Sequence, residues 1–446
     1  MGIKYLYIQT FGCQMNVHDS EQMVELMRRE GYQKTDDFRK ADLIIVNTCT
    51  IREKAQQKAY SLIGRFRNFK KERPDLVIGV GGCVAQQLGR DLIKQVPYID
   101  LVFGTHNVHR LPELVHNAEI IKGPQVETSF YDKTESLNII STPEKGAVSA
   151  YVTIMQGCNN YCAFCVVPYV RGREESRNEK DILTEIEALA DHGIKEVTLL
   201  GQNVNSYGKT FKNGVSFSTL LRNIGRIGGI RRIRFTTSHP KDLTDDIIDC
   251  FGDIEALCEH IHLPVQSGSD AVLKRMNRRY TRSDYLEKVE KLRHRSPGIS
   301  ITSDMIVGFP GETEKDFYDT LDLMEQVRFD NLFSFKYSDR PGTQASAFVE
   351  KVQTEMMSER LIKLQAIQET YSLESNKASE GMTEEVLVEG MSKNCKDDLM
   401  GRTRTNKIVN FRGGVSLRGE IIRLKIRRAY LHSLRGDIFN KEVMRC

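Results

Sequence analysis

Three cysteines, Cys158, Cys162 and Cys165, lie within one short segment, GCNNYCAFC. Their spacing is C-x3-C-x2-C, and three thiolates on one tight loop can each bind a different iron of a four-iron cube. No further cysteine follows until Cys250, so the fourth iron would lack a protein thiolate. That iron would then be free to bind a chelating small molecule. A redox-active cofactor needs such an open coordination site.

Two simpler interpretations of this segment compete with an open cluster. A structural zinc site usually takes two pairs of C-x2-4-C ligands, and the second pair is missing here. A cluster that only carries electrons usually has a fourth cysteine nearby, and none is present. Both alternatives therefore fit the spacing less well than an open four-iron cluster.

Three more cysteines close strand-like runs near the N-terminus. Cys13, Cys49 and Cys83 end the runs 3–13, 41–49 and 75–83, with helical patterns over 20–30 and 52–70 between them. Alternation of strand and helix predicts a parallel α/β sheet, and ligands of such sheets gather beyond the carboxyl ends of the strands. The pattern therefore predicts that these three cysteines lie at one sheet edge.

A second strand–helix series follows a polar segment, 120–147, which we interpret as a linker with some local structure. Helical patterns separate its strands, for example over 179–192, 283–295 and 314–328. Six strands at this spacing favour an incomplete (βα) barrel, although a flat sheet has the same order. The predicted strands are 150–156, 196–201, 232–238, 260–265, 300–309 and 331–338.

The C-terminal part changes character. A connecting helix is predicted over 353–376, and short β runs follow over 384–390, 407–411 and 419–434. These runs fit a small all-β barrel of the oligonucleotide-binding kind. Residues 401–446 hold 12 Lys/Arg against 3 Asp/Glu, although the whole chain has a net charge of only +4. A basic end on a near-neutral body suggests a polyanion partner, and a solvated basic face is the alternative.

Composition restricts the class of protein further. The chain has 446 residues, too many for one ordinary core, and no run of 18 apolar residues that would predict a membrane span. The N-terminus enters a strand directly and has no signal-peptide pattern, so a cytoplasmic location is expected. Thiols stay reduced there, so the ten cysteines call for metal binding or catalysis rather than disulfides. Cys250 and Cys258 are predicted to be buried core thiols.

The resemblance to a known family rests on these cysteines and on many further segments. Phe164 stands before the last cysteine of C-x3-C-x2-C, which resembles the radical S-adenosylmethionine (SAM) motif. The whole chain resembles the radical SAM methylthiotransferase family. The matching segments are FGCQMN, NTCTIRE, GGCVAQ, YVTIMQGCNNYCAFCVVPYVRGRE, LLGQNVNSYG, TTSHP, HLPVQSGS, SDMIVGFPGETE and YSDRPGTQA.

The resemblance implies a three-domain plan. Residues 3–119 would form a methylthiotransferase domain that holds an auxiliary [4Fe–4S] cluster on Cys13, Cys49 and Cys83. After the linker 120–147, residues 148–374 would form a radical SAM barrel with a second [4Fe–4S] cluster on Cys158, Cys162 and Cys165. Residues 375–440 would form a TRAM domain that binds RNA.

The implied reaction adds a methylthio group to carbon 2 of an adenine. One SAM would donate the methyl group and another would provide the radical, because that C–H is not acidic enough for acid–base chemistry. The segments GCQMN, CVVPYVRGRE and GRTRTNKIVNF most resemble the branch that acts on N6-isopentenyladenosine at position 37 of tRNA. Another tRNA adenosine or a ribosomal protein is the alternative substrate. A two-cluster RNA-binding electron carrier is the alternative from another class.

Polar residues at the strand ends are candidates for SAM contact, with turn formation or helix capping as the alternative. These cofactor-binding candidates are Gln202, Asn203, Asn205, Ser238, Gln266, Ser267 and Asp304. Phe164 would shield the cluster from water, and simple packing of its ring against neighbouring side chains is the alternative. The candidate RNA-binding cations are Arg402, Arg404, Lys407, Arg412, Arg423, Lys425, Arg427 and Arg428, interleaved with Phe411 and Tyr430. The expected partners are the tRNA anticodon stem-loop, a low-potential electron donor and a sulfur or cluster donor.

Overall fold

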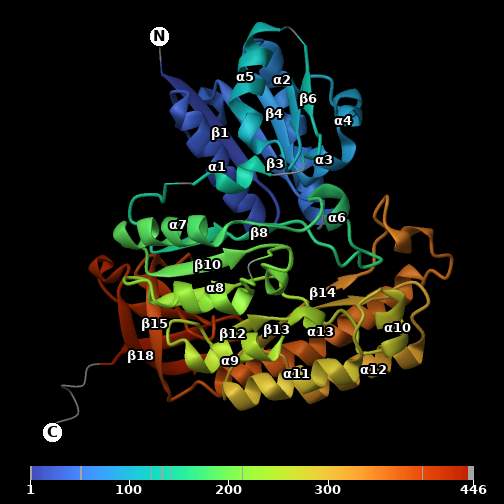
Figure 1. Ribbon diagram of the computed structural model, residues 1–446, viewed down its shortest axis with the longest axis vertical. Coiled ribbons are helices and arrows are strands. Elements are labelled where there is room, and N and C mark those ends of the chain that lie inside the picture. The colour runs from blue at the N-terminus through green and yellow to red at the C-terminus, as the bar shows by residue number, and fades with distance from the viewer. Residues whose placement is uncertain are drawn as a thin grey trace.

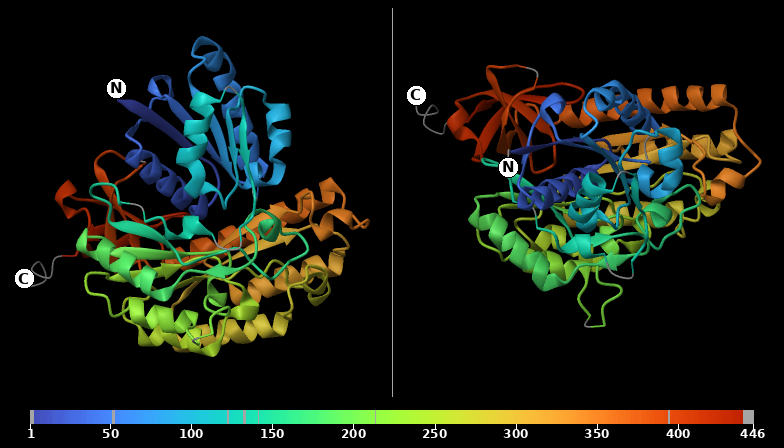
Figure 2. Two further views of the ribbon diagram at one scale, coloured as in Figure 1. Left: turned by 45° about the horizontal axis from the view of Figure 1, so that its top comes forward. Right: turned by 90° about the horizontal axis from the view of Figure 1, so that it is seen from above.

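The computed structural model describes residues 3–50, 53–121, 123–131, 134–140, 142–212, 214–393 and 395–439. Three units follow one another along the chain (Figure 1). An α/β domain stands above a central barrel, and a small all-β barrel lies beside the central one, at one end of a long helix (Figures 1 and 2). The last residue of the predicted TRAM domain, 440, lies outside the described residues.

The N-terminal domain is a six-stranded, all-parallel sheet with apolar cores on both faces. The strand order is β2-β1-β3-β4-β5-β6, so the three cysteine-bearing strands are direct neighbours. Its strands are β1 (Lys4–Thr10), β2 (Tyr32–Lys34), β3 (Leu43–Thr48), β4 (Val77–Gly82), β5 (Leu101–Phe103) and β6 (Gln125–Glu127). Its helices are α1 (Gln14–Arg29), α2 (Glu53–Glu72), α3 (Cys83–Leu88), α4 (Arg90–Gln95) and α5 (Leu111–Ile120).

The central unit is a curved array of six parallel strands, open between its first and last strand in the part of the chain that is described. Two three-stranded sheets, β7-β10-β11 and β12-β13-β14, are joined by a bridge between Ile233 and Leu257. The strands are β7 (Ser149–Thr153), β10 (Glu196–Leu200), β11 (Arg232–Phe235), β12 (His260–His262), β13 (Ser300–Val307) and β14 (Asn331–Lys336). The incomplete barrel predicted from the strand–helix order is confirmed.

Helices cover the outside of this array and bury its largest apolar core. They are α7 (Glu179–Asp191), α8 (Phe217–Ile224), α9 (Asp245–Asp253), α10 (Asp270–Arg275), α11 (Arg282–Arg295), α12 (Glu314–Val327) and α13 (Thr354–Lys377). The short β8 (Met155–Gln156) pairs with β9 (Glu175–Ser176), and α6 (Val167–Val170) lies between them in the chain. This excursion from the barrel carries the C-x3-C-x2-C loop and reaches up to the N-terminal domain (Figure 1).

The C-terminal unit is a closed five-stranded barrel, as the sequence predicted. Its order is β15-β16-β17-β19-β18 and its core is small and apolar. The strands are β15 (Thr383–Met391), β16 (Asp398–Thr403), β17 (Ile408–Arg412), β18 (Ile421–Ala429) and β19 (Leu434–Ile438).

Several elements differ from the sequence prediction, and each difference has a local cause. The predicted run 419–434 is one strand, β18, followed by a turn in which Tyr430 donates its backbone N–H to the carbonyl of Ser433, and β19 begins only at Leu434. The predicted linker 120–147 contains β6, which extends the N-terminal sheet. The strands β2, β5 and β6 escaped prediction because three residues show no period. β16 also escaped, because Gly401 interrupts its pattern where the backbone of Leu387 passes closely.

No helix within the described residues is both long and apolar enough to cross a membrane.

Candidate functional site

The register of the N-terminal sheet brings its three cysteines together. Thr10 of β1 is aligned with Asn47 of β3, and Asn47 is aligned with Gly81 of β4. Each strand reaches a cysteine within three residues of that line, at the carboxyl edge. The backbone of Gly12 lies so close that a Cβ there would be 2.6 Å from the Cβ of Cys49. The three cysteines therefore lie at one edge of the sheet, as their spacing predicted.

Burial and a pair of asparagines shape this N-terminal trio. Cys49 and Cys83 are 1% and 2% exposed. Burial raises the pKa of Cys83 to about 12, and the neighbouring Cys49 and Cys13 act in the same direction while Arg171 opposes them. The side chains of Asn16 and Asn47 hydrogen-bond each other at 3.1 Å and tie α1 to β3. Asn16 also accepts the thiol of Cys13 at 3.3 Å, a contact that the sequence prediction missed.

The loop of Cys158, Cys162 and Cys165 follows β8 and is held on several sides. The backbone N–H of Gly157 donates to the side-chain oxygen of Gln202. Cys165 closes a turn by donating its N–H to the carbonyl of Cys162 at 2.9 Å. Burial, with Cys162 close by, raises the pKa of Cys165 to about 12, and burial raises that of Cys158 to about 11. The metal-free thiols of Cys158 and Cys165 are therefore protonated at neutral pH and must lose their protons when they bind iron.

Arg278 is a contact of this loop that sequence reasoning missed. Its guanidinium is 3.4 Å from the sulfur of Cys162 and also bonds the hydroxyl of Tyr280 at 3.0 Å. Its two neighbours Asn277 and Arg279 have positive φ angles of 58° and 57°, as Tyr161 of the cluster loop has at 48°. Such backbone strain in non-glycine residues often marks functional sites. The run MNRRY carries no spacing signal that could have indicated this role.

Asp242 joins the cluster loop to two strand ends of the barrel. Its carboxylate accepts the side-chain amide of Asn203 at 2.7 Å and that of Asn160, which lies in the cluster loop, at 3.5 Å. Burial acts to raise its pKa, but hydrogen bonds from Lys209, Lys241 and Asn203 outweigh burial and hold the pKa well below its usual range. This carboxylate is therefore ionised and fixes the loops around the cysteines.

Three of the predicted SAM-binding residues have buried polar atoms with no hydrogen-bond partner within the described residues. They are the side-chain oxygen of Asn203, both amide atoms of Asn205 and the hydroxyl of Ser238. Asn205 is 4% exposed and Ser238 is 5% exposed. A buried polar group without a partner costs about 1–3 kcal/mol, so such a cluster calls for a bound polar molecule. The donor set beside the Cys158 loop therefore fits SAM.

The other predicted cofactor contacts are placed differently. The hydroxyl of Ser267 lies 3.3 Å from the hydroxyl of Thr320 and accepts the N–H of Ser269. Ser267 therefore stabilises a turn, which was the alternative to SAM contact. Asp304 lies 3.5 Å from the ring of His262. Gln266 is 7% exposed and has a positive φ of 76° at its strand end. Phe164 packs edge-to-face on Phe309 at 6.5 Å, within a small apolar cluster under the loop.

The segment that follows the Cys158–Cys165 loop contacts a residue of the N-terminal trio at the junction between the domains. Cys83 forms a buried apolar cluster with Val166 and Val170, which directly follow the Cys158–Cys165 loop. No disulfide links any cysteine among the described residues. In the same part of the chain, no three His, Cys, Asp or Glu side chains are close enough to hold one metal ion. A four-iron cube binds each thiolate at a different corner and keeps them further apart.

The basic set of the C-terminal barrel divides into two groups. Arg404 forms an ion pair with Glu259 of the central barrel at 2.7 Å and also donates to the carbonyl of Leu257. Lys407 donates to the carbonyl of Ser375 at 2.6 Å, and burial lowers its pKa. Arg402 is paired with Glu389 at 2.8 Å. Arg404 and Lys407 therefore tie this barrel to the central barrel and to α13, and Arg402 is paired within its own barrel, which charge counting does not reveal.

The remaining cations of the set lie on strand ends and outer faces of the C-terminal barrel. Arg412, Arg423, Arg427 and Arg428 are exposed, and Lys425 is half-buried. Arg427 is paired with Asp437 at 2.9 Å, and Arg428 stacks over the ring of Tyr430 at 5.2 Å. Phe411, by contrast, is a core residue with 0% exposure. Candidate RNA contacts therefore concentrate on β18 and on the end of β17.

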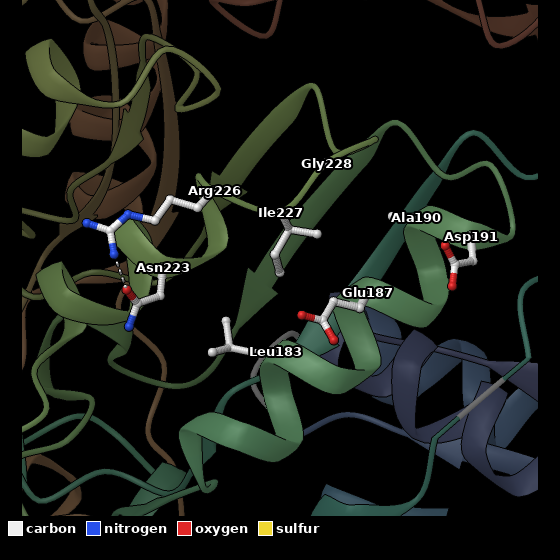
Figure 3. A pocket seen from close by; sticks show the side chains of 8 residues that line it. All are labelled: Leu183, Glu187, Ala190, Asp191, Asn223, Arg226, Ile227 and Gly228. Atoms are coloured by element: carbon white, nitrogen blue, oxygen red, sulfur yellow. Dashed lines mark hydrogen bonds between the residues drawn. The ribbon is translucent and has the colours of Figure 1, made fainter.

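Two cavities lie away from both trios. One of about 330 Å³ lies on the outer helical layer, between α7 and the end of α8 (Figure 3). Glu187 points toward this gap, and Arg226 is turned to Asn223, with which it shares a hydrogen bond of 3.1 Å. A second, of about 360 Å³, lies between β14, α13 and residues 431–432. Neither is lined by a predicted site residue.

Models of three protein families match the chain in succession. Residues 5–104 match "Uncharacterized protein family UPF0004", residues 152–324 match "Radical SAM superfamily", and residues 377–439 match "TRAM domain". The partial barrel with its three-cysteine loop, together with the radical SAM match, defines a radical SAM enzyme. The UPF0004 and TRAM domains flank this barrel, and TRAM is a domain of the RNA-binding type.

Relatives narrow this class. The chain is 59% identical over 441 residues to tRNA-2-methylthio-N(6)-dimethylallyladenosine synthase of Syntrophus aciditrophicus (strain SB), covering 99% of this chain and 96% of the relative. It is 53% identical over 439 residues to the protein of that name in Geobacter metallireducens, covering 98% and 99%. The chain belongs to the radical SAM methylthiotransferase family, as the motifs predicted, and to the group of relatives with this name.

Solved structures agree on the fold. The radical S-adenosylmethionine methyltransferase TsrM from Kitasatospora setae, with tryptophan and a SAM analog bound, has a TM-score of 0.58 at 16% identity, covering 77% of this chain and 75% of that chain. The cobalamin-dependent radical enzyme OxsB with S-adenosylmethionine bound has a TM-score of 0.53 at 14% identity, covering 82% and 56%. At these identities the likeness concerns the fold alone.

Proposed function

We propose that the protein adds a methylthio group to carbon 2 of N6-isopentenyladenosine at position 37 of tRNA, with one SAM as methyl donor and another as radical source. Relatives that are 59% and 53% identical over nearly the whole chain carry the name of that activity. The observation that carries the proposal is the junction where Cys83 packs against Val166 and Val170. Sulfur insertion at a radical centre needs both trios at one chamber, and this contact supports such an arrangement.

The residues divide the work between two centres. Cys158, Cys162 and Cys165 would hold the radical SAM cluster, and Cys13, Cys49 and Cys83 would hold the auxiliary [4Fe–4S] cluster. When bound, the clusters and SAM supply a carbon-centred radical and a sulfur donor, which no side chain can provide. Cysteine binds iron as the thiolate, and burial keeps Cys83, Cys158 and Cys165 protonated in the metal-free chain, so these three must lose their protons when iron binds.

The surrounding residues bind, orient and exclude water. Asn203, Asn205 and Ser238 offer their unpartnered polar atoms to SAM. Gln202 and Arg278 hold the cluster loop at Gly157 and Cys162. Gln266, which follows β12, and Asp304, which lies in β13, are further candidates for contact with SAM.

The RNA partner fits the C-terminal barrel. Exposed cations on β18 neutralise phosphates of the anticodon stem-loop, and Tyr430 with Arg428 offers a surface on which a base can stack. A low-potential electron donor and a source of sulfur complete the reaction, which takes place in the cytoplasm.

The direct test is mass spectrometry of tRNA nucleosides. The chain is expressed in a bacterial strain whose own synthase gene is deleted, so that its tRNA carries isopentenyladenosine without sulfur. Expression should restore 2-methylthio-N6-isopentenyladenosine, and a chain with Cys158, Cys162 and Cys165 all changed to Ala should not. If the methylthio group appears on a different nucleoside or on a ribosomal protein instead, the proposed substrate is wrong.

A further inference from the structure

The segment that follows the radical SAM loop is clamped by the N-terminal domain. Val170 and Arg171 end the short helix α6, which begins two residues after Cys165. The hydroxyl of Thr105 donates to the carbonyl of Val170 at 2.6 Å, and the ring nitrogen Nε2 of His106 is 3.0 Å from the carbonyl of Arg171. The backbone that leaves one cysteine loop is therefore fixed to the domain that carries the other trio.

The side chain of Arg171 continues this connection. Its guanidinium forms an ion pair with Asp19 of α1 at 2.6 Å, and the two side chains are 3% and 8% exposed. The residue that caps the start of α1 is Cys13. Arg171 therefore extends from the radical SAM half into the helix that begins at an auxiliary cysteine.

A buried ion pair of this kind is weak evidence for stability, because desolvation of the two charges offsets their attraction. Its position indicates another role. Val170, the neighbour of Arg171, touches Cys83, and the charge of Arg171 lowers the pKa of Cys83 against the effect of burial. Burial acts to lower the pKa of Arg171, but Asp19 and, after it, Cys83 and Cys13 outweigh burial and raise that pKa. A permanent cation thus lies within electrostatic reach of two auxiliary sulfurs.

We propose that Arg171 is a positioning residue that raises the reduction potential of the auxiliary cluster and fixes that cluster relative to the radical SAM loop, with Asp19 as the opposing charge. This inference rests on the proposed function, because it presupposes an auxiliary cluster on Cys13, Cys49 and Cys83. Reduction adds one negative charge to a cluster. A cation in a poorly solvated place stabilises the reduced form more than the oxidised form, and an anion does the opposite.

The two charges give the test opposite signs. The full-length chain with Cys158, Cys162 and Cys165 changed to Ala holds only the auxiliary cluster, which is reconstituted anaerobically. Its midpoint potential is measured by titration with reductant, followed by electron paramagnetic resonance. In this background, Arg171→Gln should shift the midpoint to a lower potential and Asp19→Asn to a higher one. Arg171→Lys keeps the positive charge, so its midpoint potential should lie close to that of the chain with Arg171.

A matched control separates charge from damage. Arg360 and Glu312 form another buried pair, at 2.6 Å with side chains 7% and 1% exposed, in the central barrel. Arg360→Gln breaks a pair of the same kind, and none of the six cysteines is among its described hydrogen-bond partners. It should leave the midpoint unchanged. Midpoints that do not move, or that move in the same direction for Arg171→Gln and Asp19→Asn, would overturn the inference.

Failure of this inference is distinguishable from failure of the proposed function. The potential is read without SAM or tRNA, so an unshifted auxiliary cluster in the two variants contradicts only the role of Arg171. If the background chain takes up no cluster at all, the auxiliary site itself is wrong, and both proposals fail. Should Arg171→Gln not fold, Asp19→Asn still tests the sign of the effect.

Discussion

The loop of Cys158, Cys162 and Cys165 and the sheet edge of Cys13, Cys49 and Cys83 assemble three thiols in different ways. The loop trio spans eight residues and is shaped by turns of its own backbone. The sheet trio comes from three neighbouring parallel strands, with gaps of 36 and 34 residues, and depends on their register. The first trio is visible as a motif, whereas the second becomes a site only when the sheet is complete.

This difference teaches where each site is vulnerable. A local loop depends on the few contacts that hold it, here Gln202, Arg278 and Asp242. A site at a sheet edge depends on strand order and on whatever covers the edge, here Val166 and Val170 from the other half. Changes aimed at one trio should therefore leave the other intact.

The largest effect is expected from the cysteines themselves. Cys162→Ala should abolish both the release of 5′-deoxyadenosine from SAM and methylthio transfer, whereas Cys49→Ala should abolish transfer but leave SAM cleavage detectable. Each variant should lose about half of the roughly eight irons that two cubane clusters hold. Iron assays and chromatography of SAM products measure this. Full methylthio transfer by Cys162→Ala would end the radical assignment.

Two glycines test the same comparison at the backbone. A Cβ on Gly12, with φ of +133°, would be 2.6 Å from the Cβ of Cys49, and one on Gly157, with φ of +78°, would be 2.0 Å from the carbonyl oxygen of Arg173. Gly12→Ala should lose the iron of the auxiliary cluster, and Gly157→Ala should lose the iron of the radical SAM cluster. Each variant should also lose about 1–3 kcal/mol of stability.

Gly31 is the control for this pair of variants. It also has a positive φ, +84°, but no atom lies within 4 Å of its added Cβ. Gly31→Ala should therefore cost about 1 kcal/mol in thermal unfolding and leave the iron content unchanged. Equal iron loss in all three variants would show that strain alone, and not the site, is responsible.

A smaller effect is expected in the SAM pocket beside the loop trio. Asn205→Ala should weaken SAM binding about 10-fold, since one or two hydrogen bonds to a buried amide are worth about 1–2 kcal/mol. Ser267→Ala should not, because its hydroxyl is used in a turn with Thr320 and Ser269. Equilibrium dialysis with the reconstituted protein measures both, and unchanged binding by Asn205→Ala would contradict the pocket.

The C-terminal cations should separate by role. Arg423→Ala should weaken tRNA binding about 3-fold and reduce the salt dependence of binding by about one phosphate contact. Arg404→Ala should instead lower the melting temperature, because it removes the ion pair with Glu259 that holds the two barrels together. Binding isotherms at several salt concentrations distinguish the two variants. A reduced salt slope for Arg404→Ala would place that residue in the RNA site after all.

A pH-dependent effect is expected from His18, which lies in α1 at the contact with the central barrel. Burial, with Arg177 and Arg171 nearby, lowers its pKa to about 3 from an ordinary 6.5, and its ring bonds Thr153 at 3.0 Å. The folded histidine is neutral, so its contribution to stability is complete above pH 6.5 and is lost as the pH falls toward 3. Between pH 6.5 and 5 the loss should be about 2 kcal/mol. His18→Asn should flatten this dependence, as followed by thermal unfolding.

Much of the fold could be predicted because its longer elements are strongly periodic. The six barrel strands and the helices α7, α11, α12 and α13 were found within a few residues of their bounds. The predicted burial of Cys250 and Cys258 is confirmed, at 0% and 1% exposed. The elements that were missed are short, or carry a glycine where another backbone passes.

The site was less predictable. Arg278 and Arg171 carry no spacing signal, because the sulfur of Cys162 and the carboxylate of Asp19 that they contact lie 116 and 152 residues away in the chain. Arg404 and Lys407 look like RNA contacts by charge, yet they face the central barrel and α13.

The sequence by itself determined the cysteine loop, the alternation of strands and helices, and the basic C-terminal end, because these depend on spacing and composition within short segments. Only the tertiary structure decided that β1, β3 and β4 are neighbours, that Cys83 touches the segment after Cys165, and that Arg171 meets Asp19. Those contacts join residues far apart in the chain, and their geometry is set by how whole sheets and helices pack.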